Sequence, residues 1–136
     1  MLTKDDSPVT PEIKSLVEKF IARVSPKYPA MISAMLYGPY AKGDEKSAEP
    51  LQLALLLNSP KGALFEVTSA EFNFVAHEFA LDFHVQVKPT PIWMEEWETP
   101  TKYAQPDLIT EINNNGVSFA VPKHATFAAP EQIDVQ

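Results

Sequence analysis

The apolar residues of the chain change their spacing from segment to segment, and each spacing predicts one kind of element. Between residues 11 and 24 they recur every three or four positions, which predicts an amphipathic helix with one buried stripe. Thr10 is a suitable N-cap, and Pro11 suits the first helical position because its missing N–H would have no helical partner there. The stripe consists of Ile13, Leu16, Val17, Phe20, Ile21 and Val24.

Two almost uninterrupted apolar runs follow, and both predict buried strands. The first is AMISAMLY, which precedes Gly38, and the second is LQLALLL at residues 51–57. The segment TSAEFNFVAHEFA at residues 68–80 then returns to helical spacing. Thr68 stands three residues before Glu71, which predicts a capping box at the start of this second helix.

Residues 81–88, LDFHVQVK, alternate apolar and polar side chains, which predicts a half-exposed strand. Asp82, His84 and Gln86 would share its polar face, either as the wall of a cleft or, as the favoured interpretation, as ordinary solvated side chains. A helix from about Pro106 to Gly116 and a short strand in VSFAVP complete the pattern. The predicted order is helix, strand, loop, strand, helix, strand, helix, so the fold class is α/β of the α+β type, with a small mixed sheet flanked by helices.

Composition limits the classes of protein to which the chain can belong. Its 136 residues predict one domain, 1–136, with loosely ordered termini at 1–9 and 122–136. The net charge is -7 and Arg23 is the only arginine, so no basic patch for nucleic acid is expected. The absence of cysteine excludes disulfides and thiolate metal sites. With neither a signal-peptide core nor an apolar run of roughly 18 to 20 residues, a cytoplasmic protein without membrane contact is predicted.

The stretch LYGPYAKGD, followed by EPLQLALLL, resembles the signature of the minimal nucleotidyltransferases of the DNA polymerase β superfamily. In that signature an apolar strand ends in Gly-Ser, a short helix carries a basic stretch ending in Gly-Asp, and the next strand begins Ser-Asp-hydrophobic-Asp. The later segments WMEEWETP and ITEINNNGVSFA resemble the tail of the same family, so the resemblance covers most of residues 12–120. It implies a strand ending at Gly38, a short helix beginning at Pro39 and a second strand from Leu51.

The residue-by-residue correspondence departs from the family where its chemistry takes place. Pro39 stands at the family's serine, and Tyr40 and Lys42 stand at its two basic positions. Pro50 and Gln52 stand where the family has two aspartates that hold metal ions for attack on an α-phosphate. Proline has no side-chain ligand atom and glutamine offers only neutral groups. Pro39 also lacks the hydroxyl and the N–H that bind phosphates at a helix start.

These departures predict a nucleotidyltransferase-like pseudoenzyme that acts as a binding or regulatory module without a cofactor or a metal. The residues expected to border its residual ligand cleft are Gly38, Pro39, Tyr40, Lys42, Gln52 and His84. A nucleotide is the less favoured ligand. Minimal members of the family often act beside a helical partner of the HEPN type, in two-component or toxin–antitoxin pairs. The resemblance therefore implies a protein partner or self-association.

Two alternatives remain open from the sequence. The chain could be an active, magnesium-dependent nucleotidyltransferase in which Asp82, Glu49 and Asp44 replace the missing aspartates. The match could also be accidental and the chain an unrelated α/β domain. A continuous helix or a hairpin over Leu36–Leu57 would favour that second alternative.

The histidines and tryptophans carry weaker signals. His77, His84 and His124 lack the spacing of a metal site, so no metal site is predicted from them. Trp93 and Trp97, four residues apart, could form an exposed aromatic patch for a partner. Packing under an edge of the domain is the favoured interpretation of this pair.

Overall fold

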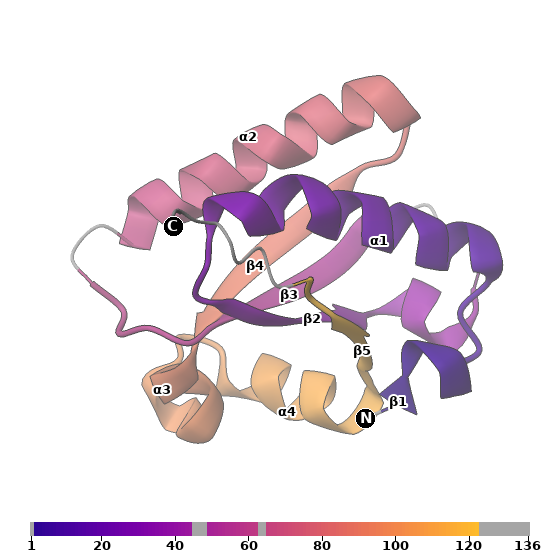
Figure 1. Cartoon of the computed structure of the whole chain (residues 1–136). Coiled ribbons are helices and arrows are strands. Elements are labelled where there is room, and N and C mark those ends of the chain that lie inside the picture. Colours follow the sequence, from indigo (N-terminus) through magenta and orange to yellow (C-terminus); the bar gives the residue numbers. More distant parts are fainter. Residues whose placement is uncertain (1, 45–48, 63–64, 123–136) are drawn as a thin grey trace, which may run out of the picture.

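The computed structural model describes residues 2–44, 49–62 and 65–122, which form a mixed sheet with helices on both of its faces (Figure 1). The strands lie in the order β1-β5-β2-β3-β4, where β2 is antiparallel to β3 and β5, and the pairs β1–β5 and β3–β4 are parallel. The strands are β1 (Leu2–Thr3), β2 (Met31–Tyr37), β3 (Leu51–Leu57), β4 (Val87–Trp93) and β5 (Val117–Ala120). The α-helices are α1 (Pro11–Val24), α2 (Phe65–Phe83), α3 (Met94–Glu98) and α4 (Pro106–Asn115). This is the predicted mixed α/β class.

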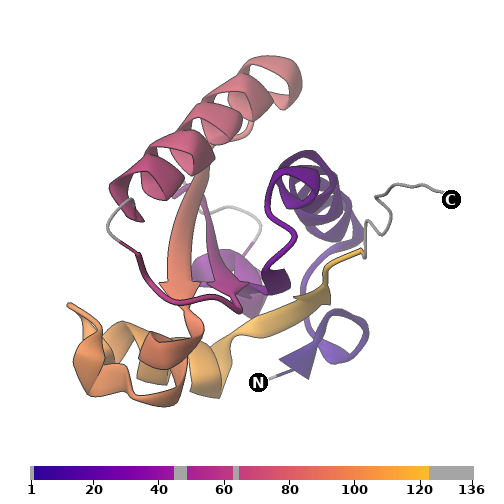
Figure 2. The same ribbon diagram turned by 60° about the vertical axis from the view of Figure 1, so that its left-hand side comes forward.

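Strand β3 is buried on both of its faces. Leu53, Leu55 and their odd-numbered neighbours pack into a core cluster beneath α1 and α2. Ala54 and Leu56 point the other way, into a second cluster that contains Ile109 and Ile112 of α4. Figure 2 shows the two helix layers on opposite sides of the sheet. An uninterrupted apolar run is what a strand covered on both faces requires, so the prediction for residues 51–57 is confirmed.

Helix α1 forms where the sequence predicts it. The Thr10 hydroxyl accepts a hydrogen bond from the Ile13 N–H at 3.3 Å, which caps the first turn. Four residues of the stripe are fully buried, and the Phe20 ring packs edge-on against Phe79 of α2 at a centroid distance of 5.5 Å. The two helices therefore share one aromatic contact above the sheet.

Helix α2 is longer at both ends than its sequence pattern predicts. It begins at Phe65, so Thr68 lies inside the helix and the predicted capping box is wrong. The Glu71 carboxylate instead accepts a hydrogen bond from the Tyr28 hydroxyl. Phe83 stacks on Phe79 one turn earlier, at a centroid distance of 4.5 Å, and this contact extends the helix into the region predicted as a strand.

The strand predicted at residues 81–88 is correspondingly wrong in its first half. Asp82 lies on the last turn of α2, and His84, with a left-handed φ of 57°, ends the helix. Strand β4 begins only at Val87 and continues to Trp93. Apolar residues at alternate positions of LDFHVQV suit a strand. Phe83 suits a helix as well, because it stands four residues after Phe79 and the two share a helical face.

Strand β4 forms one edge of the sheet and contains two prolines. The Leu51 N–H donates to the Gln86 carbonyl at 2.9 Å, which fixes the register of the parallel ladder. Because alternate residues of such a strand face the neighbouring strand, Pro89 and Pro91 occupy positions whose N–H would face the free edge. Their missing donors therefore cost no ladder bond, and they block pairing with another strand at this edge.

The other predictions made from the sequence agree with the structure in part. Helix α4 and strand β5 lie where they are predicted. Trp93 is buried and Trp97 packs against the second cluster, so the tryptophans form no exposed patch. Residues 2–9, predicted to be loosely ordered, include β1 and the buried Val9. His124 and residues 123–136 lie outside the described residues. Among the described helices, none has the length and apolar character that crossing a bilayer requires.

The burial of β3 predicts that Leu55→Ala will lower the free energy of unfolding by about 2 to 5 kcal/mol, because Leu55 is 0% exposed and its removal leaves a cavity. Chemical denaturation measures this loss. Ile32→Ala on β2, where the side chain is 44% exposed, is the control and should cost less than about 1 kcal/mol. Equal losses in the two variants would contradict the burial of β3 beneath α1 and α2.

Candidate functional site

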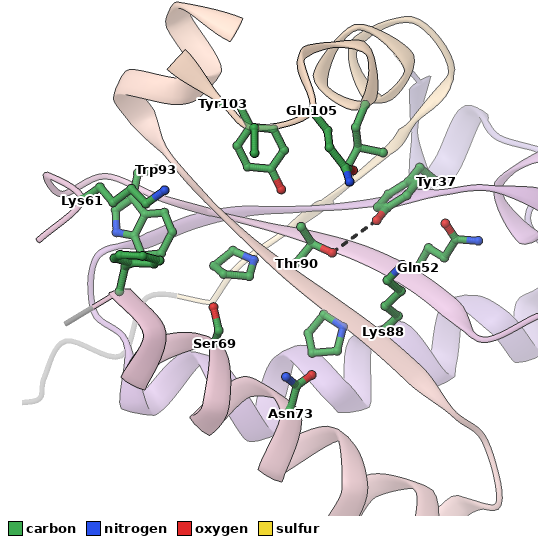
Figure 3. Close-up of a pocket in the computed structure, with 15 residues that line it drawn as sticks. Tyr37, Gln52, Lys61, Ser69, Asn73, Lys88, Thr90, Trp93, Tyr103 and Gln105 are labelled. Carbon is green, nitrogen blue, oxygen red and sulfur yellow. Dashed lines mark hydrogen bonds between the residues drawn. The ribbon is translucent and has the colours of Figure 1, made fainter. Parts of the chain in front are cut away.

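Two open hollows meet at Gln52, at the end of the sheet where helical cover is incomplete. The first, the Gly38 hollow, has a volume of about 460 Å³ and lies beside the start of the 3-10 helix η3 (Pro39–Lys42). Its lining residues are Gly38, Pro39, Lys42, Asp44, Glu49, Gln52 and Glu111. The second, the β4 groove, has a volume of about 530 Å³ and follows strand β4 between α2 and the segment before α4 (Figure 3).

The connection from β2 to β3 has the predicted frame of strand, short helix and strand. Strand β2 ends at Tyr37, η3 begins at Pro39, and the Ala41 N–H donates to the Gly38 carbonyl at 3.1 Å. Gly38 has φ 82° and ψ -163°, a conformation available to glycine but strained for other residues. The described part of this stretch, residues 36–44 and 49–57, forms no continuous helix. Strands β2 and β3 do pair antiparallel, as in a hairpin, which favours an unrelated α/β domain, whereas the short helix η3 between them is the feature that the resemblance implies.

Gln52 lies directly over Gly38. A Cβ atom added to Gly38 would stand 2.8 Å from the Gln52 Nε2 atom, so the glycine also makes room for this amide. The same Nε2 group donates to the Glu49 Oε1 atom at 3.2 Å. Gln52 is thus held at the border between the two hollows and lines both of them.

A row of three side chains crosses three strands on the face that carries α4. Tyr37 of β2 is the neighbour of Gln52 of β3, and Gln52 is the neighbour of Lys88 of β4. Cross-strand neighbours in a sheet point to the same face. The Tyr37 hydroxyl also lies 3.3 Å from the Thr90 Oγ1 atom, at hydrogen-bonding distance (Figure 3). The row therefore presents a phenol, an amide and an ammonium group to the groove.

The far end of the β4 groove holds a second cation. The Lys61 Nζ atom lies 3.1 Å from the Glu96 Oε2 atom and 4.6 Å from the centroid of the Phe65 ring. Glu96 is 2% exposed, and its other oxygen accepts from the Trp93 N–H at 3.2 Å, so both oxygens of this buried carboxylate are hydrogen-bonded, one to Lys61 and one to the backbone. Lys88, by contrast, has no ion-pair partner within the described parts of the chain. A lysine therefore stands near each end of the groove.

Polar side chains line the groove between the two lysines. Ser69 and Asn73 project from α2, and Tyr103 and Gln105 from the segment before α4, as Figure 3 shows. Hydroxyl and amide groups of this kind both donate and accept hydrogen bonds. Because Glu96 compensates the charge of Lys61, Lys88 is the lysine of the groove without an ion pair in the described ranges, and together with these hydrogen-bonding groups it suits an anionic ligand that carries polar substituents.

The structure brings together most of the site residues predicted from the sequence. Gly38, Pro39, Lys42 and Gln52 border the Gly38 hollow, together with Asp44 and Glu49. Tyr40 instead packs against the first core cluster and lines neither hollow. Asp82 and His84 do not line either hollow, because they belong to the end of α2; the Asp82 carboxylate there pairs with Arg23.

The sequence pattern did not identify Tyr37, Lys61, Lys88 or Tyr103 as site residues. Lys88 becomes visible only through the register of β4 against β3, and that register depends on where β4 begins. No group of three or more histidine, aspartate or glutamate side chains that could hold a metal ion occurs in the described ranges.

No protein-family model matches this chain, and no curated protein matches it.

The geometry at Gly38 predicts that Gly38→Ala will lower the free energy of unfolding by about 1 to 3 kcal/mol, because φ 82° is strained for alanine. Denaturation of the variant measures the loss. Gly62→Ala is the matched control, since a Cβ atom there meets no atom within 4 Å. Adding Gln52→Ala to Gly38→Ala should recover only the part of the lost free energy that is due to the contact between the new Cβ atom and the Gln52 side chain. A loss no larger than that of Gly62→Ala would argue against the strained turn.

Burial of the tyrosines predicts a loss of stability in alkali. Burial, assisted by the charge of Glu111, raises the pKa of Tyr37, and burial also raises the pKa of Tyr103. A raised folded pKa means that this stabilisation is complete below the unfolded value of about 10 and is lost as pH rises through the folded value. The free energy of unfolding should therefore fall above about pH 10, and less steeply in Tyr37→Phe. Denaturation across this pH range tests it; identical slopes for both proteins would contradict the raised pKa.

Proposed function

We propose that the chain is a nucleotidyltransferase-like domain that has lost nucleotidyl transfer and serves as a regulatory module, binding an anionic ligand in the β4 groove without a metal ion. The observation that carries the proposal is the row of Tyr37, Gln52 and Lys88 across the sheet. Nucleotidyl transfer requires carboxylates in this region to hold two metal ions, and the row contains none.

The chemistry of two-metal catalysis explains why the row of Tyr37, Gln52 and Lys88 argues against nucleotidyl transfer. In the family that the sequence resembles, two aspartates come from one strand and a third carboxylate from a later strand. The corresponding positions are Pro50, directly before β3, and Gln52 on β3, and the neighbour of Gln52 on β4 is Lys88. Two unit charges about 4 Å apart interact by about 4 kcal/mol at an effective dielectric constant of 20. An ammonium group at Lys88 would thus repel a divalent ion that the amide of Gln52 cannot hold alone.

The frame that would carry the site supports the resemblance in fold. Gly38 directly follows β2, η3 begins at Pro39, and β3 follows beside β2. Pro39 suits the first turn of a helix but removes an N–H that could bind phosphate. Pro39 is therefore compatible with the fold but unfavourable for binding the phosphates that nucleotidyl transfer requires.

An active transferase with rearranged carboxylates has less support. Asp44 and Glu49 border the Gly38 hollow, but Asp82 pairs with Arg23 at the end of α2. The alternative would need a third acid from elsewhere, and Glu111 at the same hollow is the described candidate.

Calorimetric titration with ATP, GTP, CTP and UTP, with and without magnesium, tests the proposal. We expect no magnesium-dependent binding to the natural chain, because the positions at Pro50, Gln52 and Lys88 provide no carboxylate. The triple variant Pro50→Asp, Gln52→Asp, Lys88→Asp is the positive control and should gain magnesium binding. Anionic compounds that bind without metal should bind about tenfold more weakly to Lys88→Gln, the loss of one charged contact.

Incubation of the chain with labelled nucleotides and a cell extract tests the alternative of an active transferase. Transfer of label by the natural chain, abolished by Glu49→Ala or Glu111→Ala, would establish the rearranged enzyme and overturn the proposal. Loss of transfer in Asp82→Ala would do the same by the route predicted from the sequence.

A further inference from the structure

Helix α2 is apolar on two opposite faces, and the sheet uses only one of them. The inner face buries Phe72, Val75, Ala76 and Phe79 against the core. On the outer face Val67, Phe74 and Leu81 are 52%, 59% and 66% exposed. A helix that is apolar all round is normally covered all round. Figures 1 and 2 show no described element over the outer side of α2.

The exposed side chains form one continuous stripe. Residues 67, 74 and 81 are seven positions apart, and Ala70 and His77, both exposed, stand between them at three- and four-residue spacing. We call these five residues the outer stripe. Its spacing is that of the a and d positions of a coiled coil, and fourteen residue steps of helix span about 21 Å. The other exposed large apolar side chains on the described residues are Leu2, Ile32 and Phe65, and none of them extends the outer stripe. A contiguous stripe marks an interaction surface more strongly than single residues do.

Acidic residues flank the outer stripe on both sides. At 100° per residue, Glu71, Glu78 and Asp82 follow one side of it and Glu66 the other. Residues 65–83 contain no lysine or arginine. Arg23 pairs with Asp82 and the Tyr28 hydroxyl bonds to Glu71, while Glu66 and Glu78 have no ion pair within the described ranges. The surface beside the outer stripe is therefore negatively charged.

Charge decides between the possible occupants of the stripe. A second copy of α2 would bring the same acidic flanks together, in a chain whose net charge is already -7. A helix with lysine or arginine at its e and g positions would instead pair with Glu66 and Glu78 while its apolar seam covers Phe74 and Leu81. Complementary flanks select the partner, and the buried apolar side chains provide most of the affinity.

We propose that the outer stripe docks an amphipathic helix of a protein partner, with an apolar seam at heptad spacing and basic flanks. This inference deepens the regulatory role proposed above by naming the class of its protein partner, and it rests on that role. The two can fail separately, because no residue of the outer stripe lines the β4 groove or the Gly38 hollow.

Two synthetic helical peptides of equal length test the proposal on the full chain. Both carry leucine at the a and d positions; one has lysine and the other glutamate at e and g. Fluorescence anisotropy should show binding of the lysine peptide, with Phe74→Gln and Leu81→Gln each weakening it about tenfold or more. Ile32→Gln, which removes an exposed apolar side chain from β2, is the matched control and should leave affinity within about twofold.

Charge reversal provides a readout that apolar contact alone would not change. Glu78→Lys should weaken binding of the lysine peptide and strengthen that of the glutamate peptide. Equal affinity for both peptides, no binding of either, or unchanged binding by Phe74→Gln would each overturn the proposal. So would sedimentation of the natural chain as a dimer that Phe74→Gln dissociates, because a second copy would then occupy the stripe. Circular dichroism of each variant confirms that the fold is intact.

Discussion

The burial of β3 on both faces is the constraint on which the rest of the structure depends. Residues 53–57 are all buried, so apolar cover is needed above and below the same strand. Helices α1 and α2 provide it on one side, and α4 with part of α3 on the other. Gln52 stands at the start of the strand, where this cover ends. The position of the candidate site is therefore a consequence of how far the helices extend along β3.

Patterns within one segment were enough to predict most of the fold. The stripe of α1 satisfies helical spacing alone, and the apolar run of β3 has the short length of a buried strand, so both elements lie where they are predicted. The strand predicted around Asp82 is wrong because LDFHVQV suits two structures: a strand by its alternation, and a helix by the contact of Phe79 with Phe83. Tertiary packing selects the helix, and no pattern within the segment itself indicates this outcome.

The candidate site was predictable only where it lies within one segment. Gly38, Lys42 and Gln52 are close in the sequence and meet at one hollow. Lys88 and Tyr37 join Gln52 through strand register, and Lys61 reaches the groove through its pairing with the buried Glu96. Such neighbours are separated by tens of positions along the chain, so hydrophobic spacing does not reveal them. The resemblance to a family drew attention to Pro50 and Gln52, whereas Lys88, the neighbour of Gln52, is recognised only in the folded chain.

The free edge of β4 limits what the groove can bind. Pro89 and Pro91 offer carbonyl groups along this edge but no N–H, so a peptide cannot add there as a regular strand. The anionic ligand proposed for the groove would instead donate hydrogen bonds to the edge and place its negative charge near Lys88, since Lys61 is paired with Glu96. This combination fits a compact anion with hydroxyl or amino substituents better than an extended backbone.

Helix α2 connects the groove with the outer stripe, so any coupling between their ligands would have to pass through its movement. Its middle and C-terminal part is fixed to α1 and the segment after it by the pairs Phe20–Phe79, Arg23–Asp82 and Tyr28–Glu71. The N-terminal turns, which carry Ser69 into the groove, contact Trp93 and Lys61 through the Phe65 ring, at 6.4 Å and 4.6 Å. A partner that covers Val67 would act on this end of the helix. Coupling, if both surfaces are occupied, would therefore be expressed as a change in the width of the groove near Lys61, and not near Lys88.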